Sequence, residues 1–123
     1  MAKILIMDDN AMMLKLYSEI LKSEGYEVLA TSEAKIALDL AVSRTPDLIL
    51  LDIMMPNLDG TRVYESLAGN PKTKGIKVVF LTSLVKEEEV SSGGGMIGKH
   101  DYISKSTPKD EFIKRVKQIL SGK

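Results

Sequence analysis

The 123-residue sequence contains no cysteine, which excludes a disulfide framework and thiolate metal sites. Its 17 lysine and arginine residues balance 17 aspartate and glutamate residues, so the zero net charge gives no basic signature for nucleic acid or an anionic membrane. No apolar run reaches the length of a membrane span, and the N-terminal segment is too short for a signal peptide. These absences favour a soluble, cytoplasmic protein that binds neither membranes nor nucleic acid directly.

A chain of this length is expected to form one domain, in which folding buries roughly two thirds of the unfolded surface. No internal repeat, low-complexity segment or linker divides the sequence. We therefore expect residues 1–123 to form a single domain.

Short apolar runs alternate with segments of helical spacing. Strands are expected at residues 3–7, 26–30, 48–51 and 76–81 and around residues 102–103, and helices at residues 11–24, 34–41, 61–68, from 86 onward and at 108–120. Helical spacing predicts that the first helix has an apolar stripe formed by Met13, Leu16, Tyr17, Ile20 and Leu21. This alternation predicts an α/β fold, a doubly wound five-stranded parallel sheet of the flavodoxin-like (βα)5 type, with strand order 2-1-3-4-5 and helices on both faces.

Helix ends and turns carry their own signals. Asn10, Ser32 and Thr107 are expected N-caps, and Pro108 should follow Thr107 in the first helical turn. The three glycines at 93–95 each cost about 1 kcal/mol in a helix interior, so the fourth helix should stop at or before residue 95.

Four further residues have a structural interpretation that we prefer to a functional one. Met12, Met13 and Met55 are expected to pack against neighbours. His100, the single histidine, lies in a polar turn without metal-ligand spacing and is expected to be a solvated loop residue.

Polar residues follow the expected central strands at equivalent places: Asp8 and Asp9 after the first, Asp52 after the third, Thr82 after the fourth and Lys105 after the fifth. Parallel strands bring such residues to one edge of the sheet. In the order 2-1-3-4-5 the acids flank the crevice between the first and third strands, where open α/β sheets bind ligands. The alternative is that the acids are solvated loop residues.

The predicted cluster has carboxylate oxygens but no histidine or cysteine, which favours a hard, partly hydrated cation such as Mg²⁺. Lys105 would add a second positive charge. A carboxylate beside two cations is placed to attack a phosphoryl group, so Asp52 is predicted to be the nucleophile that forms an aspartyl phosphate.

The same residues carry a family resemblance. Asp8–Asp9, Asp52 with the following MPNLDG, Thr82–Ser83 and the segment YISK ending at Lys105 resemble the receiver domain of two-component response regulators, including the single-domain receivers of chemotaxis. The likeness spans residues 3–120, nearly the whole chain.

The resemblance implies that Asp52 takes a phosphoryl group from the phosphohistidine of a sensor histidine kinase or phosphotransfer protein. It implies that Asp9, Asp52 and the Met54 carbonyl bind Mg²⁺ directly, Asp8 through water, and that Lys105 holds a phosphoryl oxygen.

It also implies a switch pair, Thr82 and Tyr102, that relays phosphorylation to the face formed by the fourth helix, fifth strand and fifth helix. The output partner is unknown, and would be the chain's own effector domain if the chain is part of a longer regulator. Such a domain catalyses only its own Mg²⁺-dependent phosphorylation and slow dephosphorylation, so it is a switch and not an enzyme acting on a separate substrate.

Two departures from the family pattern lie near this output face. Ser106 stands where the family usually has proline after the lysine, so we expect a trans Lys105–Ser106 bond, because a cis bond before a non-proline residue costs about 2.5–4 kcal/mol. The segment between Thr82 and Lys105 is also about one residue longer than in common members. Neither departure affects the predicted phosphorylation chemistry.

Three other functions compete with this one. A flavodoxin-like electron carrier would need a phosphate-binding loop where Asp8 and Asp9 would repel a flavin phosphate. A phosphohydrolase with an aspartyl nucleophile usually has a second acid where Met54 stands. A pseudo-receiver would have lost an acid, the threonine or the lysine, and none is lost here.

Overall fold

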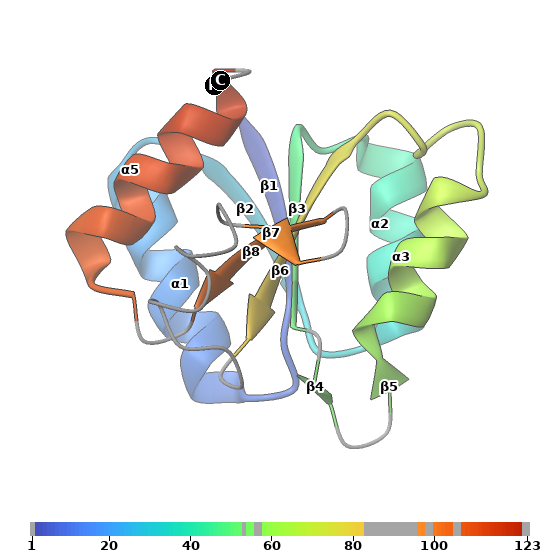
Figure 1. The fold of residues 1–123 in the computed structure, drawn as a ribbon, viewed down its shortest axis with the longest axis horizontal. Helices are drawn as coiled ribbons and strands as arrows, with labels where there is room; N and C mark the ends of the chain where they lie inside the picture. Colours follow the sequence, from blue (N-terminus) through green and yellow to red (C-terminus); the bar gives the residue numbers. More distant parts are fainter. Residues whose placement is uncertain are drawn as a thin grey trace.

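The computed structural model describes residues 2–52, 54–55, 58–82, 96–97, 100–104 and 107–121. A central sheet is flanked by α1 and α5 on one side and by α2 and α3 on the other (Figure 1). The elements are β1 (Lys3–Met7), α1 (Ala11–Ser23), β2 (Glu27–Thr31), α2 (Ala34–Arg44), β3 (Leu48–Asp52), β4 (Met54–Met55), β5 (Leu58–Asp59), α3 (Gly60–Ala68), β6 (Lys77–Thr82), β7 (Met96–Ile97), β8 (His100–Ser104) and α5 (Lys109–Leu120).

Five parallel strands form the sheet in the order β2-β1-β3-β6-β8, which confirms the predicted order 2-1-3-4-5. The sequence pattern did not predict two additions. β7 pairs antiparallel with β8 at the sheet edge, and β4 pairs antiparallel with β5 directly after β3. Among the described residues the helices number four, and residues 83–95 lie outside that part of the chain.

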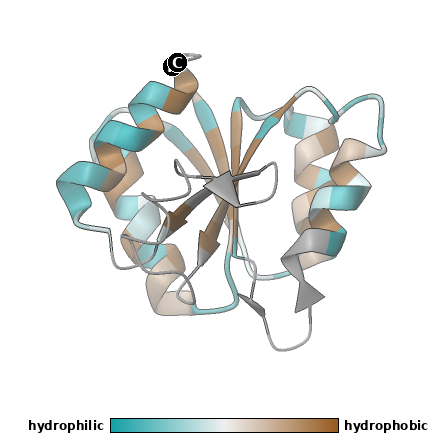
Figure 2. Ribbon diagram, in the orientation of Figure 1, coloured by the Kyte–Doolittle hydropathy of each residue, from teal (hydrophilic) through white to brown (hydrophobic). Residues whose placement is uncertain are grey.

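Two hydrophobic layers fill the space between the sheet and the helices, and Figure 2 shows the apolar residues gathered on the strands and the inward helix faces. Side chains alternate between the two faces of a strand. Ile4 and Ile6 accordingly belong to the layer that contains residues of α1 and α5, whereas Leu5 and Met7 belong to the layer of α2 and α3. Burial on both faces explains why the central strands are continuous apolar runs.

The helix caps agree only partly with the sequence prediction. Asn10 caps α1 as predicted, because its side-chain oxygen accepts hydrogen bonds from the backbone N–H groups of Met12 and Met13. Ser32 is not the cap of α2, which begins after Glu33, and α5 begins after Pro108, one residue later than a Thr107 cap requires. Neither of these two helices has a side-chain cap hydrogen bond, so their ends depend on tertiary packing.

Two side-chain placements correct the predictions. Met12 was expected to pack, but it is 81% exposed, and Leu16, one turn further along α1, is 48% exposed. The helical stripe is narrower than predicted and is carried by Tyr17, Ile20 and Leu21. Met13 does pack against the core as predicted.

His100 is the first residue of β8 and not part of a turn, because it pairs with Ile97 of β7. Met96 lies in β7, so no helix continues through it. The predicted helix end at residues 93–95 and the Lys105–Ser106 bond both lie outside the described residues.

Thr45 ends α2 in a left-handed backbone conformation, with φ of 42°. This conformation costs a β-branched residue about 1–2 kcal/mol, whereas glycine adopts it without a steric penalty but loses more entropy on folding. We expect Thr45→Gly to raise the free energy of unfolding by about 0.5–1 kcal/mol, measured by urea denaturation. The matched control is Ser43→Gly within α2, which should lower it by about 0.5 kcal/mol; equal losses in both variants would contradict the strain argument.

Candidate functional site

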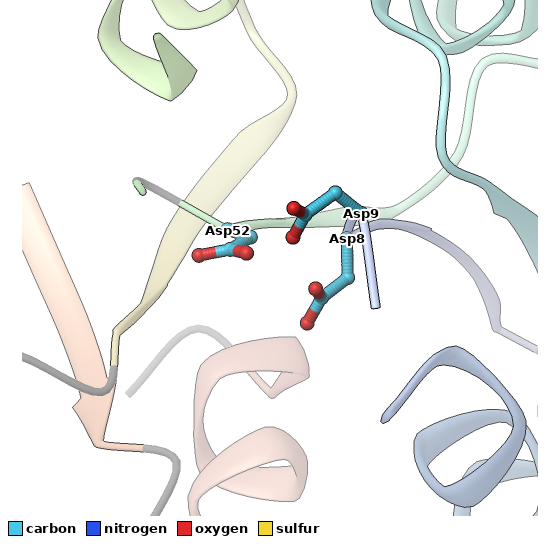
Figure 3. Close-up of side chains that lie close together, drawn as sticks. All are labelled: Asp8, Asp9 and Asp52. Atoms are coloured by element: carbon cyan, nitrogen blue, oxygen red, sulfur yellow. The ribbon is translucent and has the colours of Figure 1, made fainter. Parts of the chain in front are cut away.

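Three acidic residues meet where β1 and β3 end. Asp8 and Asp9 directly follow β1, Asp52 is the last residue of β3, and these two strands are neighbours in the sheet, with Met7 beside Leu51. One carboxylate oxygen from each acid lies within 4.8 Å of the others (Figure 3). The predicted convergence of the three acids at the switch point of the sheet is therefore confirmed.

The three carboxylates differ in burial. Asp8 is 0% and Asp52 is 2% exposed, whereas Asp9 is open to solvent. Asp8 and Asp52 lie two positions after Ile6 and Leu50, which belong to the layer covered by α1 and α5, so the packing on this face accounts for their burial. Figure 3 shows the Asp8 and Asp9 side chains leaving the chain in different directions.

The start of α1 is tied to the acidic cluster. One Asp8 carboxylate oxygen, Oδ1, accepts a hydrogen bond of 2.9 Å from the backbone N–H of Asn10, the residue that caps α1. The backbone N–H of Asp8 donates to the Thr31 carbonyl at 3.3 Å, which connects the end of β1 to β2. The positive end of the helix dipole therefore faces the acids and partly offsets their repulsion.

The donor set of this cluster is purely oxygen, with two buried carboxylates and one exposed carboxylate. Gathering three negative charges is costly unless a cation or a proton offsets them. Oxygen ligands at this separation suit a hard divalent cation that keeps part of its water shell, as Mg²⁺ does. The residues present thus fit the cation that the sequence predicted.

The remaining predicted site residues are placed through their strands. Thr82 ends β6 beside Ser104, and Tyr102 lies in β8 beside Phe80, so both strands reach the same sheet edge as Asp52, whose neighbour in β6 is Leu81. The side chains of Thr82, Tyr102 and Met54 and the whole of Lys105 lie outside what the structure describes. Their predicted roles stay predictions.

The sequence pattern places Tyr17 only in the apolar stripe of α1 and indicates no role for it near the acidic cluster. Tyr17 is 5% exposed, and burial together with the charges of Asp8 and Asp52 raises its pKa to about 12. A polar atom in an apolar helical stripe was the available signal, but the sequence does not show that α1 places it near two acids.

We expect this raised pKa to make stability sensitive to alkali. Between the unfolded value of 10.0 and the folded value of about 12, the unfolded chain loses the Tyr17 proton while the folded chain keeps it, so stability falls as pH rises through this window. The free energy of unfolding of the parent, relative to Tyr17→Phe, should fall by about 1–2 kcal/mol between about pH 9 and pH 11. Urea denaturation at each pH measures the free energy of unfolding of both proteins. If it depended on pH in the same way in the parent and in Tyr17→Phe, the raised pKa of Tyr17 would be contradicted.

Comparison with known proteins agrees with this geometry. The family model described as the response regulator receiver domain matches residues 4–117. The polar-differentiation response regulator DivK of Brucella anthropi is 33% identical over 120 residues, which cover 95% of this chain and 94% of DivK.

Solved structures show the same fold. A response regulator from Desulfuromonas acetoxidans is 27% identical and superposes with a TM-score of 0.79, covering 98% of both chains. The chemotaxis protein CheY4 of Vibrio cholerae, at 24% identity and a TM-score of 0.81, covers 97% of this chain and 98% of its own. None of the helices in the described part of the chain is long and apolar enough to cross a membrane.

Proposed function

This chain belongs to the response regulator receiver domain family of two-component signalling, and from that premise we propose that Asp52 is its phosphoryl acceptor. The observation that carries the proposal is the buried Asp52 carboxylate, held at a strand end within 4.8 Å of two further carboxylates. Phosphorylation there would change the domain surface that an output partner recognises.

In the proposed transfer, an Asp52 carboxylate oxygen attacks the phosphorus of a phosphohistidine. An oxygen–phosphorus bond forms, the nitrogen–phosphorus bond breaks, and its electron pair returns to the imidazole of the donor. The aspartate is a suitable acceptor because the sheet holds it at the end of β3 beside the two other acids, and positioning supplies much of the catalysis of phosphoryl transfer.

The cation site of this proposal consists of Asp8, Asp9, Asp52 and the Met54 carbonyl. Met54 begins β4 two residues after Asp52, so its backbone stays close to the acidic cluster. Bound Mg²⁺ supplies positive charge that offsets the carboxylates and the oxygens of the transferring group. Lys105, which follows β8 by one residue, supplies a second cation in this proposal.

The proposed relay to the surface runs through Thr82 and Tyr102. Its support is the pairing of β6 with β8, which places Thr82 beside Ser104 and Phe80 beside Tyr102. A hydroxyl that moves toward the phosphoryl group leaves space for the tyrosine ring to turn inward. The change would be read by an output partner on β8, α5 and the segment between β6 and β7.

The partner that supplies the phosphoryl group is a sensor histidine kinase or a phosphotransfer protein, and the domain works with it in the cytoplasm. The domain would catalyse only its own phosphorylation and slow dephosphorylation, so it is a switch without a separate substrate. Accepting a phosphoryl group in this way distinguishes the domain from a pseudo-receiver, which binds partners without accepting phosphate.

A small-molecule phosphodonor tests the proposal without knowledge of the kinase. The chain is mixed with acetyl phosphate and Mg²⁺, and intact-protein mass spectrometry and the amide NMR spectrum are followed. We expect one acid-labile phosphoryl group and amide shifts around the acidic cluster, β6 and β8, all of which require Mg²⁺. Absence of both changes would favour a pure interaction module.

A further inference from the structure

A short hairpin follows the acid at the end of β3. Its strands β4 and β5 pair antiparallel, with Met54 facing Asp59 and Met55 facing Leu58. They lie beyond the end of β3, next to the start of α3 (Figure 1). Met54 comes two residues after Asp52, and two residues of chain span at most about 7 Å. The hairpin therefore begins beside the acidic cluster.

The pairing in this hairpin determines which backbone groups are used for hydrogen bonds. Facing residues of an antiparallel pair alternate between a pair that exchanges both backbone hydrogen bonds and a pair that exchanges none. Only two residues separate Met55 from Leu58 in the sequence, so these innermost facing residues form the hydrogen-bonded pair. Met54 and Asp59 then form the pair without hydrogen bonds, and the N–H and C=O groups of Met54 point away from β5.

Both strands of the hairpin are joined to buried parts of the fold. β4 follows β3, and β5 runs directly into α3, which begins at Gly60. Val63 and Leu67 of α3 are buried in the same hydrophobic layer as Leu51 of β3. A two-stranded hairpin on its own is at best marginally stable in water. These two anchors therefore supply stability that the hairpin lacks by itself.

We propose that the hairpin of β4 and β5 is a positioning element for the cation site, in which the Met55–Leu58 backbone pair keeps the Met54 carbonyl turned away from β5 and available to Mg²⁺. This inference rests on the proposed function, because it concerns the cation that the phosphorylation uses. Met55 and Leu58 contact neither the ion nor the phosphorus in this account; they act through the backbone of Met54.

Proline substitution tests the backbone pair directly, because proline has no N–H group. Leu58→Pro and Met55→Pro each remove one of the two hydrogen bonds of the pair, which gives the Met54 backbone freedom that it must lose again when the ion binds. Removal of groups that orient metal ligands typically lowers metal affinity by about 10–100-fold. One hydrogen bond of the pair remains in each variant, so we expect Mg²⁺ binding to weaken roughly tenfold.

The matched control is Lys74→Pro, which removes one backbone hydrogen bond from another loop. The Lys74 N–H donates to the Asn70 carbonyl at 2.9 Å, and the Lys74 side chain is exposed. This loop precedes β6, whereas the acids follow β1 and β3, so it lies at the opposite end of the parallel sheet. Lys74→Pro should keep Mg²⁺ affinity within about twofold of the parent. Calorimetric titration measures Mg²⁺ binding, and urea denaturation without Mg²⁺ shows that each variant is folded.

Amide hydrogen exchange of the parent tests the pairing without any substitution. The amides of Met55 and Leu58 should exchange at least about tenfold more slowly than the amide of Asp59, because only the hydrogen-bonded pair is protected. Equally fast exchange of all three amides would overturn the inference, even if neither proline variant folds.

The titrations separate positioning from a merely structural role. Weaker Mg²⁺ binding in the folded hairpin variants, together with parent-like binding in Lys74→Pro, supports the proposal. Unchanged affinity in the hairpin variants, or equal weakening in all three variants, overturns it. If the parent binds Mg²⁺ and accepts phosphate but the hairpin variants bind Mg²⁺ equally well, only the role of the hairpin fails. If the parent binds no Mg²⁺, the proposed cation site fails and this inference fails with it.

Discussion

Asp52→Asn should reduce phosphate incorporation from acetyl phosphate to background while the fold stays intact. The amide has the shape of the carboxylate but is not a nucleophile toward phosphorus. Removal of a catalytic nucleophile costs up to about 10⁶ in rate, so a loss of at least about 1,000-fold is expected. The substitution also removes one of three clustered negative charges, so thermal unfolding should not occur at a lower temperature than in the parent.

The control for this prediction is Asp39→Asn, which removes an exposed carboxylate of α2. Intact-protein mass spectrometry should show parent-like incorporation in Asp39→Asn. Undiminished incorporation in Asp52→Asn would instead assign the phosphoryl group to another residue. Loss in both variants would point to a general effect of charge.

The second large effect concerns how long the phosphoryl group remains. Hydrolysis needs a water in line with the phosphorus, on the side opposite Asp52, and polar side chains can hold that water. In receivers that this sequence resembles, the residues two beyond the phosphorylated aspartate and two beyond the switch threonine stand beside this path. Here they are Met54 and Leu84, both apolar, and Leu84 lies outside the described residues.

We therefore expect slow self-dephosphorylation, so that the domain retains its signal unless a separate phosphatase acts. The double change Met54→Asn with Leu84→Glu should speed the loss of phosphate by roughly 10–100-fold, because it supplies groups that can orient the water. Decay is followed by mass spectrometry after the phosphodonor is removed. Loss from the parent within seconds would contradict the water-access argument.

A matched double change tests whether added polarity alone has this effect. Ile36→Asn on α2 and Leu16→Glu on α1 place the same residue types at exposed positions away from the strand end that carries Asp52. This variant should keep the slow decay of the parent. Equal acceleration in both double variants would remove the special role of Met54 and Leu84.

The strand order and the acidic cluster were predictable from the sequence. Strand and helix periodicity are local properties, and right-handed parallel connections leave few ways to assemble alternating elements. An acid that follows each of β1 and β3 must then reach the same sheet edge, which is why the meeting of Asp8, Asp9 and Asp52 could be predicted.

Other features of the fold depend on which surfaces pack together, and only the tertiary structure shows them. The pattern of α1 could not show that Met12 and Leu16 are exposed, because the width of an apolar stripe depends on how its neighbours cover it. The starts of α2 and α5 shifted for a similar reason, since packing outweighs weak cap preferences. The short strands β4, β5 and β7 have too few residues to carry a periodic signal of their own.

Tyr17 also shows which features depend on the sequence alone and which depend on tertiary packing. The sequence by itself put Tyr17 on the apolar stripe of α1 and put Asp8 and Asp52 at strand ends, because those positions follow from spacing along the chain. Only the packing of α1 and α5 on one face of the sheet decided that Tyr17 is buried beside Phe112, where burial and the charges of Asp8 and Asp52 raise its pKa. Long-range electrostatic coupling depends on distance through space, which spacing along the chain does not specify.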